Sequence, residues 1–254
     1  MILVGTSGWQ YRDWRGPFYP EGLPQRRWLE HYAAHFATVE VNNAFYRLPE
    51  RDTFAQWRAR TPDDFCVAVK VSRYLTHIKR LREPAEPVAR FVERATALGD
   101  RLGPVLLQLP PTLRADPAAL DETLALFPRE VRVAVEPRHR SWWTGEIESV
   151  LKGHNAALCW ADRKGRPVTP LWRTADFGYL RMHEGRAHPW PHYGRAALRS
   201  WLDRLDLGVD TYVYFNNDPG CAAVADAAAF AALARDRDLP VTRTPGKGLT
   251  RAGR

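Results

Sequence analysis

Side chains that can hold an anion or move a proton stand at the ends of eight short apolar runs in this chain. They are Ser7, Glu40 with Asn42, Lys70, Gln108, Glu136, Asp162, Arg181 with His183, and Asn216. Carboxylate and imidazole groups serve as general acids and bases, and ammonium and guanidinium groups bind phosphate. These residue types therefore predict acid–base chemistry on a phosphate-bearing substrate.

Glu136 is the leading candidate for the general acid or base. It follows the apolar run Val131–Val135, and Arg138 and His139 come directly after it. A carboxylate, a guanidinium and an imidazole within four residues can transfer protons and hold a phosphate. We expect His139 or His183 to be the proton-transfer partner of Glu136.

Lys70 places a charge inside an apolar strand, between Val69 and Val71. Lysine is rarely buried without a partner, and Glu40 on the neighbouring strand is the expected one. Two interpretations stay open at this point. Lys70 either belongs to a structural ion pair, or acts as an anion-binding ammonium or proton donor.

The remaining predicted site residues bind the substrate or tune these charges. The predicted substrate-binding residues are Lys70, Arg138, Arg181, Asn42, Gln108, Asn216, Trp9 and Tyr46. Glu40 and Asp162 are expected to tune Lys70 and Arg181.

A divalent metal is the less favoured alternative for the same residues. Glu40, Glu136, Asp162 and His183 are ligand types for such an ion. Lys70 and Arg181 beside them would repel it, so we expect no metal and no other cofactor. The chain also lacks a phosphate loop, a dinucleotide fingerprint, a G-x-S-x-G motif and an H-E-x-x-H motif.

The apolar runs alternate with helix-like segments. The predicted strands are Ile2–Gly5, Thr38–Val41, Cys66–Val71, Val105–Leu109, Val131–Val135, Ala156–Trp160, Gly178–Met182 and Thr211–Phe215. Eight strand–helix units in 254 residues predict one (β/α)8 barrel of the TIM type, whose active site lies where the strand carboxyl ends meet.

Apolar positions at helical spacing predict helices on the outside of this barrel. They cover Arg27–Phe36, Val88–Leu102, Pro117–Phe127, Arg195–Leu205 and Ala222–Arg235. Asp116 is the expected N-cap of the third, with Pro117 at its first position. Two prolines in Arg163–Asp176 predict an irregular sixth crossover.

Two long aromatic loops, Gly8–Pro24 and His183–Gly194, follow predicted strands and should lie over the mouth. Their aromatic rings either stack on a base or a sugar ring, or only cap the barrel.

Composition limits the class of protein. The net charge is +8, carried almost entirely by arginine, which fits either a polyanionic partner or general arginine usage. Three cysteines without metal spacing, no signal peptide and no apolar run long enough for a bilayer predict a cytoplasmic protein without membrane contact. No helix presents a clear dimer stripe, so a monomer is expected.

Several segments occur together, in this order, in one known family. They are Gly5–Trp9, Val39–Asn42 with Phe45–Pro49, Val69–Arg73 with Thr76–His77, Gly103–Pro111, Glu136–His139, Arg181–His183 and Tyr214–Asp218. The chain resembles the DUF72 family of YecE-like proteins over nearly its whole length. The resemblance implies a TIM-type barrel, which covers residues 1–245. The basic, Gly-containing segment 246–254 is expected to form a flexible tail. A likeness of this family to nucleic-acid-processing barrels such as endonuclease IV has been suggested.

Three functional hypotheses follow. The first is an enzyme acting on nucleic acid or a nucleotide, such as a hydrolase of phosphoesters. The second is a non-catalytic barrel that binds nucleic acid. The third is an enzyme that modifies a sugar or a sugar phosphate.

Overall fold

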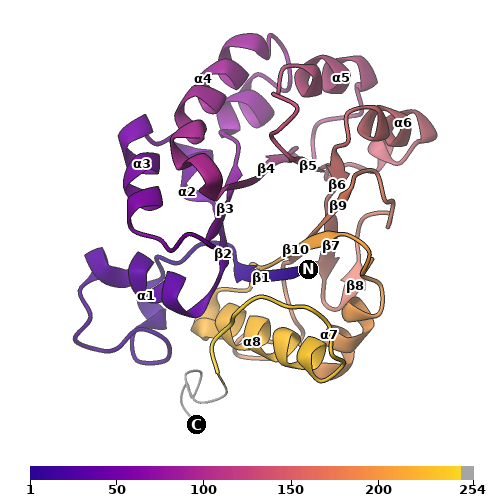
Figure 1. Ribbon diagram of the computed structural model, residues 1–254. Helices are drawn as coiled ribbons and strands as arrows, with labels where there is room; N and C mark the ends of the chain where they lie inside the picture. Colours follow the sequence, from indigo (N-terminus) through magenta and orange to yellow (C-terminus); the bar gives the residue numbers. More distant parts are fainter. Residues whose placement is uncertain (247–254) are drawn as a thin grey trace.

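The computed structural model describes residues 1–246 as strands wrapped by helices (Figure 1). The strands are β1 (Ile2–Thr6), β2 (Thr38–Val41), β3 (Cys66–Lys70), β4 (Leu102–Gln108), β5 (Val133–Glu136), β6 (Ala157–Leu158), β7 (Trp160–Arg163), β8 (Arg166–Pro167), β9 (Phe177–Met182) and β10 (Asp210–Phe215). They form two five-stranded sheets, ordered β1-β10-β9-β7-β8 and β2-β3-β4-β5-β6.

Parallel pairing brings the carboxyl ends of neighbouring strands to one side of each sheet. Every pair is parallel except the small β7–β8 hairpin. Gln108 lies opposite Glu136 where β4 and β5 end. A further parallel bridge, between Ser7 and Glu40, joins the end of β1 to β2 of the other sheet. The polar residues that follow the apolar runs are thereby gathered in one place.

Helices surround the strands on the outside (Figure 1). The α-helices are α1 (Trp28–His35), α2 (Asn43–Tyr46), α3 (Arg51–Ala59), α4 (Ala85–Ala95), α5 (Pro117–Ala125), α6 (Gly145–Gly153), α7 (Arg195–Leu202) and α8 (Ala222–Arg235). Shorter 3-10 or π segments are η1 (Arg12–Trp14), η2 (Gln25–Arg27), η3 (Tyr74–Ile78), η4 (Thr96–Arg101), η5 (Arg140–Trp142) and η6 (Pro219–Cys221).

The five predicted helices are present, with differences at their ends. Asp116 caps α5 by accepting a hydrogen bond from the Ala119 backbone N–H at 3.0 Å, which confirms the predicted cap. The predicted helix Val88–Leu102 is wrong beyond Ala95, where 3-10 structure follows. Gly99, with φ +53°, breaks the helical path there, and strand β4 begins at Leu102.

The sixth predicted strand is divided at Cys159. Its first part, β6, pairs with β5, whereas its second part, β7, pairs with β9 of the other sheet. One continuous strand over Ala156–Trp160 is therefore wrong, because the chain changes partners in the middle. The segment Arg163–Asp176 contains the β8 hairpin strand and no helix, which confirms an irregular sixth crossover.

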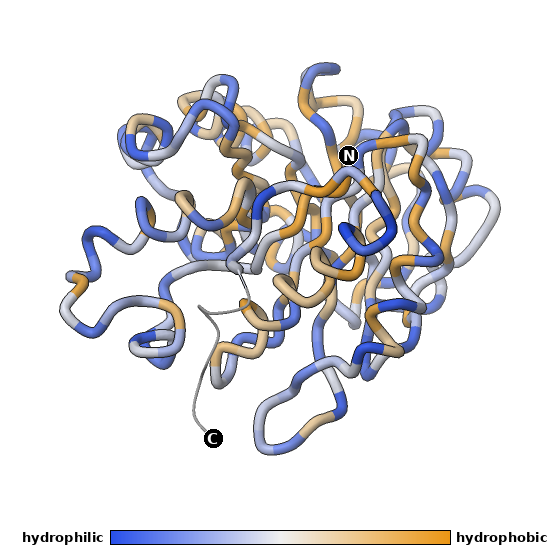
Figure 2. Tube along the Cα trace, turned by 60° about the horizontal axis from the view of Figure 1, so that its bottom comes forward, coloured by the Kyte–Doolittle hydropathy of each residue, from blue (hydrophilic) through white to orange (hydrophobic). Residues whose placement is uncertain are grey.

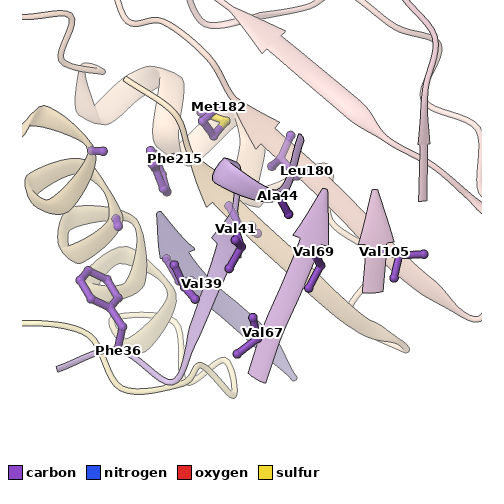
Figure 3. Close-up of a cluster of buried hydrophobic side chains, with 14 of the residues drawn as sticks. Phe36, Val39, Val41, Ala44, Val67, Val69, Val105, Leu180, Met182 and Phe215 are labelled. Atoms are coloured by element: carbon purple, nitrogen blue, oxygen red, sulfur yellow. The ribbon is translucent and has the colours of Figure 1, made fainter. Parts of the chain in front are cut away.

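Alternating residues of the strands fill two apolar clusters. Figure 3 shows Val39, Val41, Val67, Val69 and Val105 in the first, which also includes side chains of the surrounding helices. The second lies between the two sheets and consists of Ala68, Leu106, Ala134, Ala157, Cys159, Phe177, Tyr179, Tyr212 and Tyr214. Figure 2 shows hydrophilic residues concentrated in the outer loops and helices.

The residues of the second cluster explain why the site lies where it does. Ala68, Leu106, Ala134 and Tyr179 each come two positions before a polar residue of the same strand: Lys70, Gln108, Glu136 and Arg181. Residues two apart in a strand share a face. The polar residues therefore continue the same inner face beyond the apolar cluster, toward the carboxyl ends.

No helix within residues 1–246 is long and apolar enough to cross a membrane. The three cysteines are free thiols. The predicted basic tail lies, from Lys247 onward, outside the described residues.

Candidate functional site

A cavity of about 580 Å³ opens at the carboxyl ends of the strands. It is lined by Tyr11, Asn42, Phe45, Tyr46, Lys70, Arg73, His77, Gln108, Arg138, Arg181 and Asn216. Four of these side chains are cationic and none is a carboxylate. Such a lining favours an anionic ligand.

Arg181 on β9 forms the centre of a buried ion-pair network beneath this cavity. Its Nη2 donates to Glu40 Oε1 at 2.8 Å, and its Nη1 donates to Glu136 Oε2 at 2.7 Å. Glu40 also accepts hydrogen bonds from Ser7 Oγ at 2.7 Å and from the Tyr179 hydroxyl at 2.6 Å. Buried charges need partners of this quality, because desolvation is costly.

Glu136 accepts hydrogen bonds from four side chains. Besides Arg181, these are Gln108 Nε2 at 2.6 Å, His183 Nε2 at 2.9 Å and Arg138 Nη2 at 3.3 Å. Burial acts to raise the pKa of Glu136, but the charge of Arg181 and the hydrogen bond from His183 outweigh it and hold the pKa well below its usual range. Glu136 is therefore a permanent carboxylate that orients its neighbours, and it does not line the cavity.

Lys70 does not pair with Glu40, so the predicted ion pair is wrong. Its Nζ instead donates to Gln108 Oε1 at 2.7 Å and lies 3.9 Å from the centre of the Phe45 ring. Glu40 is already occupied by Arg181. Burial, with the nearby charge of Arg181, lowers the pKa of Lys70 to about 8.

His183 and Asn216 extend the network from Glu136. Because the carboxylate accepts from His183 Nε2, that nitrogen carries the proton, and Asn216 Nδ2 donates to Nδ1 at 3.1 Å. His183 is thus held in one tautomer by both of its ring nitrogens.

A family model described as "Protein of unknown function DUF72" matches residues 3–248. This chain belongs to the DUF72 family.

Similar proteins include two curated relatives. The chain is 34% identical to the UPF0759 protein YecE of Escherichia coli K12 over 153 residues, which cover 59% of this chain and 54% of that protein. The match to YecE thus spans about half of its length. The UPF0759 protein YunF of Bacillus subtilis is 25% identical over 87% of this chain and 90% of its own.

Solved DUF72 structures have the same fold. A DUF72 family protein from Thermotoga maritima superposes with a TM-score of 0.80 at 29% identity, covering 92% of this chain and 99% of that one. One from Enterococcus faecalis gives a TM-score of 0.79 at 20% identity, covering 97% and 99%.

In this DUF72 protein, the cavity and its network bring together most of the predicted site residues. Lys70, Arg138, Arg181, Asn42, Gln108, Asn216 and Tyr46 line the cavity. Glu40, Glu136 and His183 lie in the network against it.

Trp9, His139 and Asp162 lie elsewhere. Trp9 is buried and packs edge-on against Trp57, with ring centres 5.5 Å apart. His139 caps η5 through Ser141, whose backbone N–H donates to Nδ1 at 3.1 Å. Trp9 and His139 do not line the cavity. The geometry therefore does not support the predicted substrate-binding role of Trp9 or the predicted catalytic role of His139.

Asp162 does not contact Arg181 and cannot tune it as predicted. It accepts hydrogen bonds from the Tyr193 hydroxyl, from Trp201 Nε1 at 2.6 Å and from the Gly165 backbone N–H at 3.2 Å. Its carboxylate joins β7 to the loop before α7 and to α7 itself.

Most aromatic residues of the loop Gly8–Pro24 belong to the core. Trp14, Phe18 and Tyr19 are buried, and Tyr19 stacks on Trp28 at 4.5 Å. In the second loop Tyr193 is buried as well. The interpretation of these loops as caps is thus supported for these side chains, whereas Tyr11 lines the cavity.

Sequence reasoning missed four lining residues: Tyr11, Phe45, Arg73 and His77. Arg73 and His77 follow β3 directly, in and beside the π segment η3. Their position after a strand end is the signal that could have identified them, since such segments lie at the mouth.

Two buried acceptor oxygens beside the cavity lack hydrogen-bond partners among residues 1–246: Asn42 Oδ1 and Asp218 Oδ1. Burial raises the pKa of Asp218 to about 7. Tyr11 donates from its hydroxyl to the Ser7 carbonyl at 2.5 Å, and Asn42 Nδ2 donates to the same oxygen at 3.3 Å. The free oxygen of Asn42 is an acceptor for a donor group of a ligand.

The network does not fit a metal ion. No cluster of three or more His, Cys, Asp or Glu side chains suited to a metal occurs in the part of the chain that the structure describes. Arg181 lies between Glu40 and Glu136 and pairs with both, so it occupies the position between the two carboxylates.

Proposed function

We propose that this DUF72 protein is an enzyme that binds a small phosphorylated molecule in the cavity and acts on it by proton transfer. The observation that carries the proposal is the lining of four cations without a carboxylate.

The charge balance of the site supports a phosphate monoester. Lys70, Arg73, Arg138 and Arg181 face the cavity, and the two carboxylates beneath them, Glu40 and Glu136, leave a net charge of +2. A phosphate monoester carries about −2 at neutral pH. Arg73 and Arg138 are the exposed members, so they are best placed to meet the phosphate first.

Hydrogen-bonding groups support specificity for the rest of the substrate. Asn42, Gln108 and Asn216 line the same cavity. Asn42 Oδ1 has no hydrogen-bond partner among the described residues, so it can accept a hydrogen bond from a substrate group such as a hydroxyl. His183 lies just behind the lining, with its side chain 14% exposed and hydrogen-bonded to the lining residue Asn216, and it is the proposed proton-transfer group. Glu136 would act through His183 rather than by direct contact with the substrate.

The distribution of charge favours a small molecule over a polymer. Several arginines outside the cavity pair with acids, for example Arg60 with Glu30, Arg94 with Glu50 and Arg237 with Asp203. The cavity volume lies within the usual range for small-molecule sites. A nucleotide or a sugar phosphate therefore fits better than a nucleic acid.

Isothermal titration with inorganic phosphate tests the binding step. Arg138→Gln should weaken binding about tenfold, because it removes a charged contact. Arg195→Gln, an exposed arginine at the start of α7, is the matched control and should bind as the unaltered protein does. Equal affinity in both variants would contradict the site. Turnover would then be sought with a panel of nucleotides and sugar phosphates.

We also propose that the two sheets close into one (β/α)8 barrel. The Ser7–Glu40 bridge joins them on one side. On the other, β6 and β7 are consecutive and separated only by Cys159. A monomer in the cytoplasm, where free thiols persist, is part of the same proposal.

A further inference from the structure

We infer that Lys70 is the amine that forms an imine with the substrate, and that the substrate is a phosphorylated aldehyde or ketone. The inference rests on the proposed function, because binding of the phosphate group would hold the carbonyl group beside Lys70.

The surroundings of the Lys70 amine suit a nucleophile. Its Nζ faces the cavity, donates to the neutral amide of Gln108 at 2.7 Å and lies over the Phe45 ring. Within the described residues no carboxylate forms an ion pair with it, whereas Lys79, Lys152 and Lys164 each pair with a glutamate. Lys70 is the buried lysine of these four.

Lysine is rare in this chain compared with arginine, so a lysine in the cavity suggests a role that arginine cannot fill. Of 37 basic residues only five are lysine, namely Lys70, Lys79, Lys152, Lys164 and Lys247, and the other three cations of the cavity are arginine. Arginine holds phosphate well but does not lose its proton in proteins. Lysine is the one of the two whose neutral form attacks carbonyl carbon.

The lowered pKa supports this role. With the pKa at about 8, burial being the main cause, the neutral amine is present at physiological pH. At pH 8 its neutral fraction is about a hundredfold larger than that of an ordinary lysine with a pKa near 10.4.

The proposed step needs no reactant besides the substrate. The lone pair of neutral Nζ forms a C–N bond to the carbonyl carbon, and the π electrons of the C=O bond move to the oxygen, which takes up a proton. The nitrogen gives up one proton, which balances the one taken up by the oxygen, and a second proton, released to solvent when Nζ became neutral, returns to the oxygen. The oxygen then leaves as water while the nitrogen lone pair forms the C=N bond. Taken from the ammonium form, the balance is ammonium plus carbonyl to protonated imine plus water, so the charge of the site is unchanged.

Pyridoxal 5′-phosphate, which carries both an aldehyde and a phosphate, is the probe. The full chain is incubated with an equimolar amount at pH 8, reduced with borohydride and analysed by peptide mass mapping. We expect labelling of Lys70 at least about tenfold above that of Lys79, Lys152 or Lys164, given the difference in neutral fraction. Equal labelling of all four, or labelling that spares Lys70, would overturn the inference without any variant being needed.

Two further measurements separate this inference from the proposed function. Lys70→Arg retains the charge and should still bind phosphate, with an affinity altered by its larger guanidinium group, and should lose the label. Excess inorganic phosphate should protect Lys70 in the unaltered protein, and pyridoxal without phosphate should label it less. Phosphate binding without labelling of Lys70 refutes only the imine. Labelling of Lys70 by pyridoxal and its phosphate alike, without protection, refutes the phosphate site.

Discussion

At the scale of single residues, the site separates charges that are fixed from charges that can change. Arg181, Glu40 and Glu136 form buried ion pairs with one another in the interior. Lys70 and Asp218 have pKa values of about 8 and 7, near physiological pH. The fixed charges shape the cavity, and the variable ones give it a dependence on pH.

Removing the Glu136 charge should destabilise the fold. Glu136→Gln leaves Arg181 with one carboxylate instead of two, and breaking a buried pair costs about 3–5 kcal/mol. Urea denaturation at pH 7 measures the loss, with the exposed Glu146→Gln on α6 as the control. An unchanged midpoint would show that Glu136 is not needed for stability, and would favour a purely catalytic role.

The lowered pKa of Glu136 also predicts how the stability of the protein changes as the pH falls. Its contribution to stability is complete above the ordinary glutamate pKa of about 4.3. It is lost as pH falls through the lower pKa of the folded state. Stability measured from pH 6 to pH 2 should therefore fall more steeply in the unaltered protein than in Glu136→Gln. Parallel curves would contradict the ionised, paired carboxylate.

Binding of sulfate, a dianion that does not titrate in this range, should weaken as pH rises through about 8. Lys70 is charged below its lowered pKa and loses its proton above it. Lys70→Arg should remove this step, while a smaller decline near pH 7 from Asp218 persists in both proteins. Calorimetry from pH 6 to pH 9.5 provides the comparison, and identical profiles would exclude Lys70 as the titrating group.

At the scale of the elements, the sequence predicted the strands well and their partners poorly. Apolar runs overlap each of the parallel strands, although one run covers β6 and only the first residue of β7, because burial on both faces leaves a continuous hydrophobic signature. The change of partner at Cys159 depends on tertiary contacts that no local pattern contains. Likewise, the position of Lys70 was predicted but not its Gln108 partner, because Arg181 reaches Glu40 from β9 across the interior.

Asp162 shows how one carboxylate secures three segments. Asp162→Asn should destabilise the protein by about 2 kcal/mol, since charged hydrogen bonds to Tyr193 and Trp201 become neutral or unpaired. Phosphate affinity should remain unchanged, because Asp162 is not part of the cavity. Thermal denaturation and calorimetry, with the exposed Asp236→Asn as the control, separate the two effects. A loss of phosphate affinity with unchanged stability would show instead that Asp162 contributes to the binding site.

At the scale of the whole molecule, the charge of +8 was the least informative number. Composition alone could not distinguish arginines that line a ligand-binding cavity from arginines on the outer surface. The structure places four cations around one cavity and pairs many others with acids. The net positive charge therefore comes both from the cavity cations and from frequent use of arginine elsewhere in the chain.

Fluorescence anisotropy with labelled single-stranded and duplex DNA should show only weak binding at about 150 mM salt, at the level of non-specific complexes. The physical reason is that non-specific binding to the phosphate backbone weakens steeply as the salt concentration rises. A repeat at about 50 mM salt, with and without inorganic phosphate, completes the test. Tight binding that phosphate does not displace would favour the polymer-binding alternative.

The tyrosines beneath the charged network have a kinetic consequence. Tyr179, Tyr212 and Tyr214 are buried between the sheets, and Tyr179 donates directly to Glu40. They fill the interior below the residues that line the cavity, so in the proposed reaction a product would leave by the opening through which the substrate entered. A phosphorylated product should accordingly inhibit competitively with the substrate, and its release would limit the rate of the next turnover.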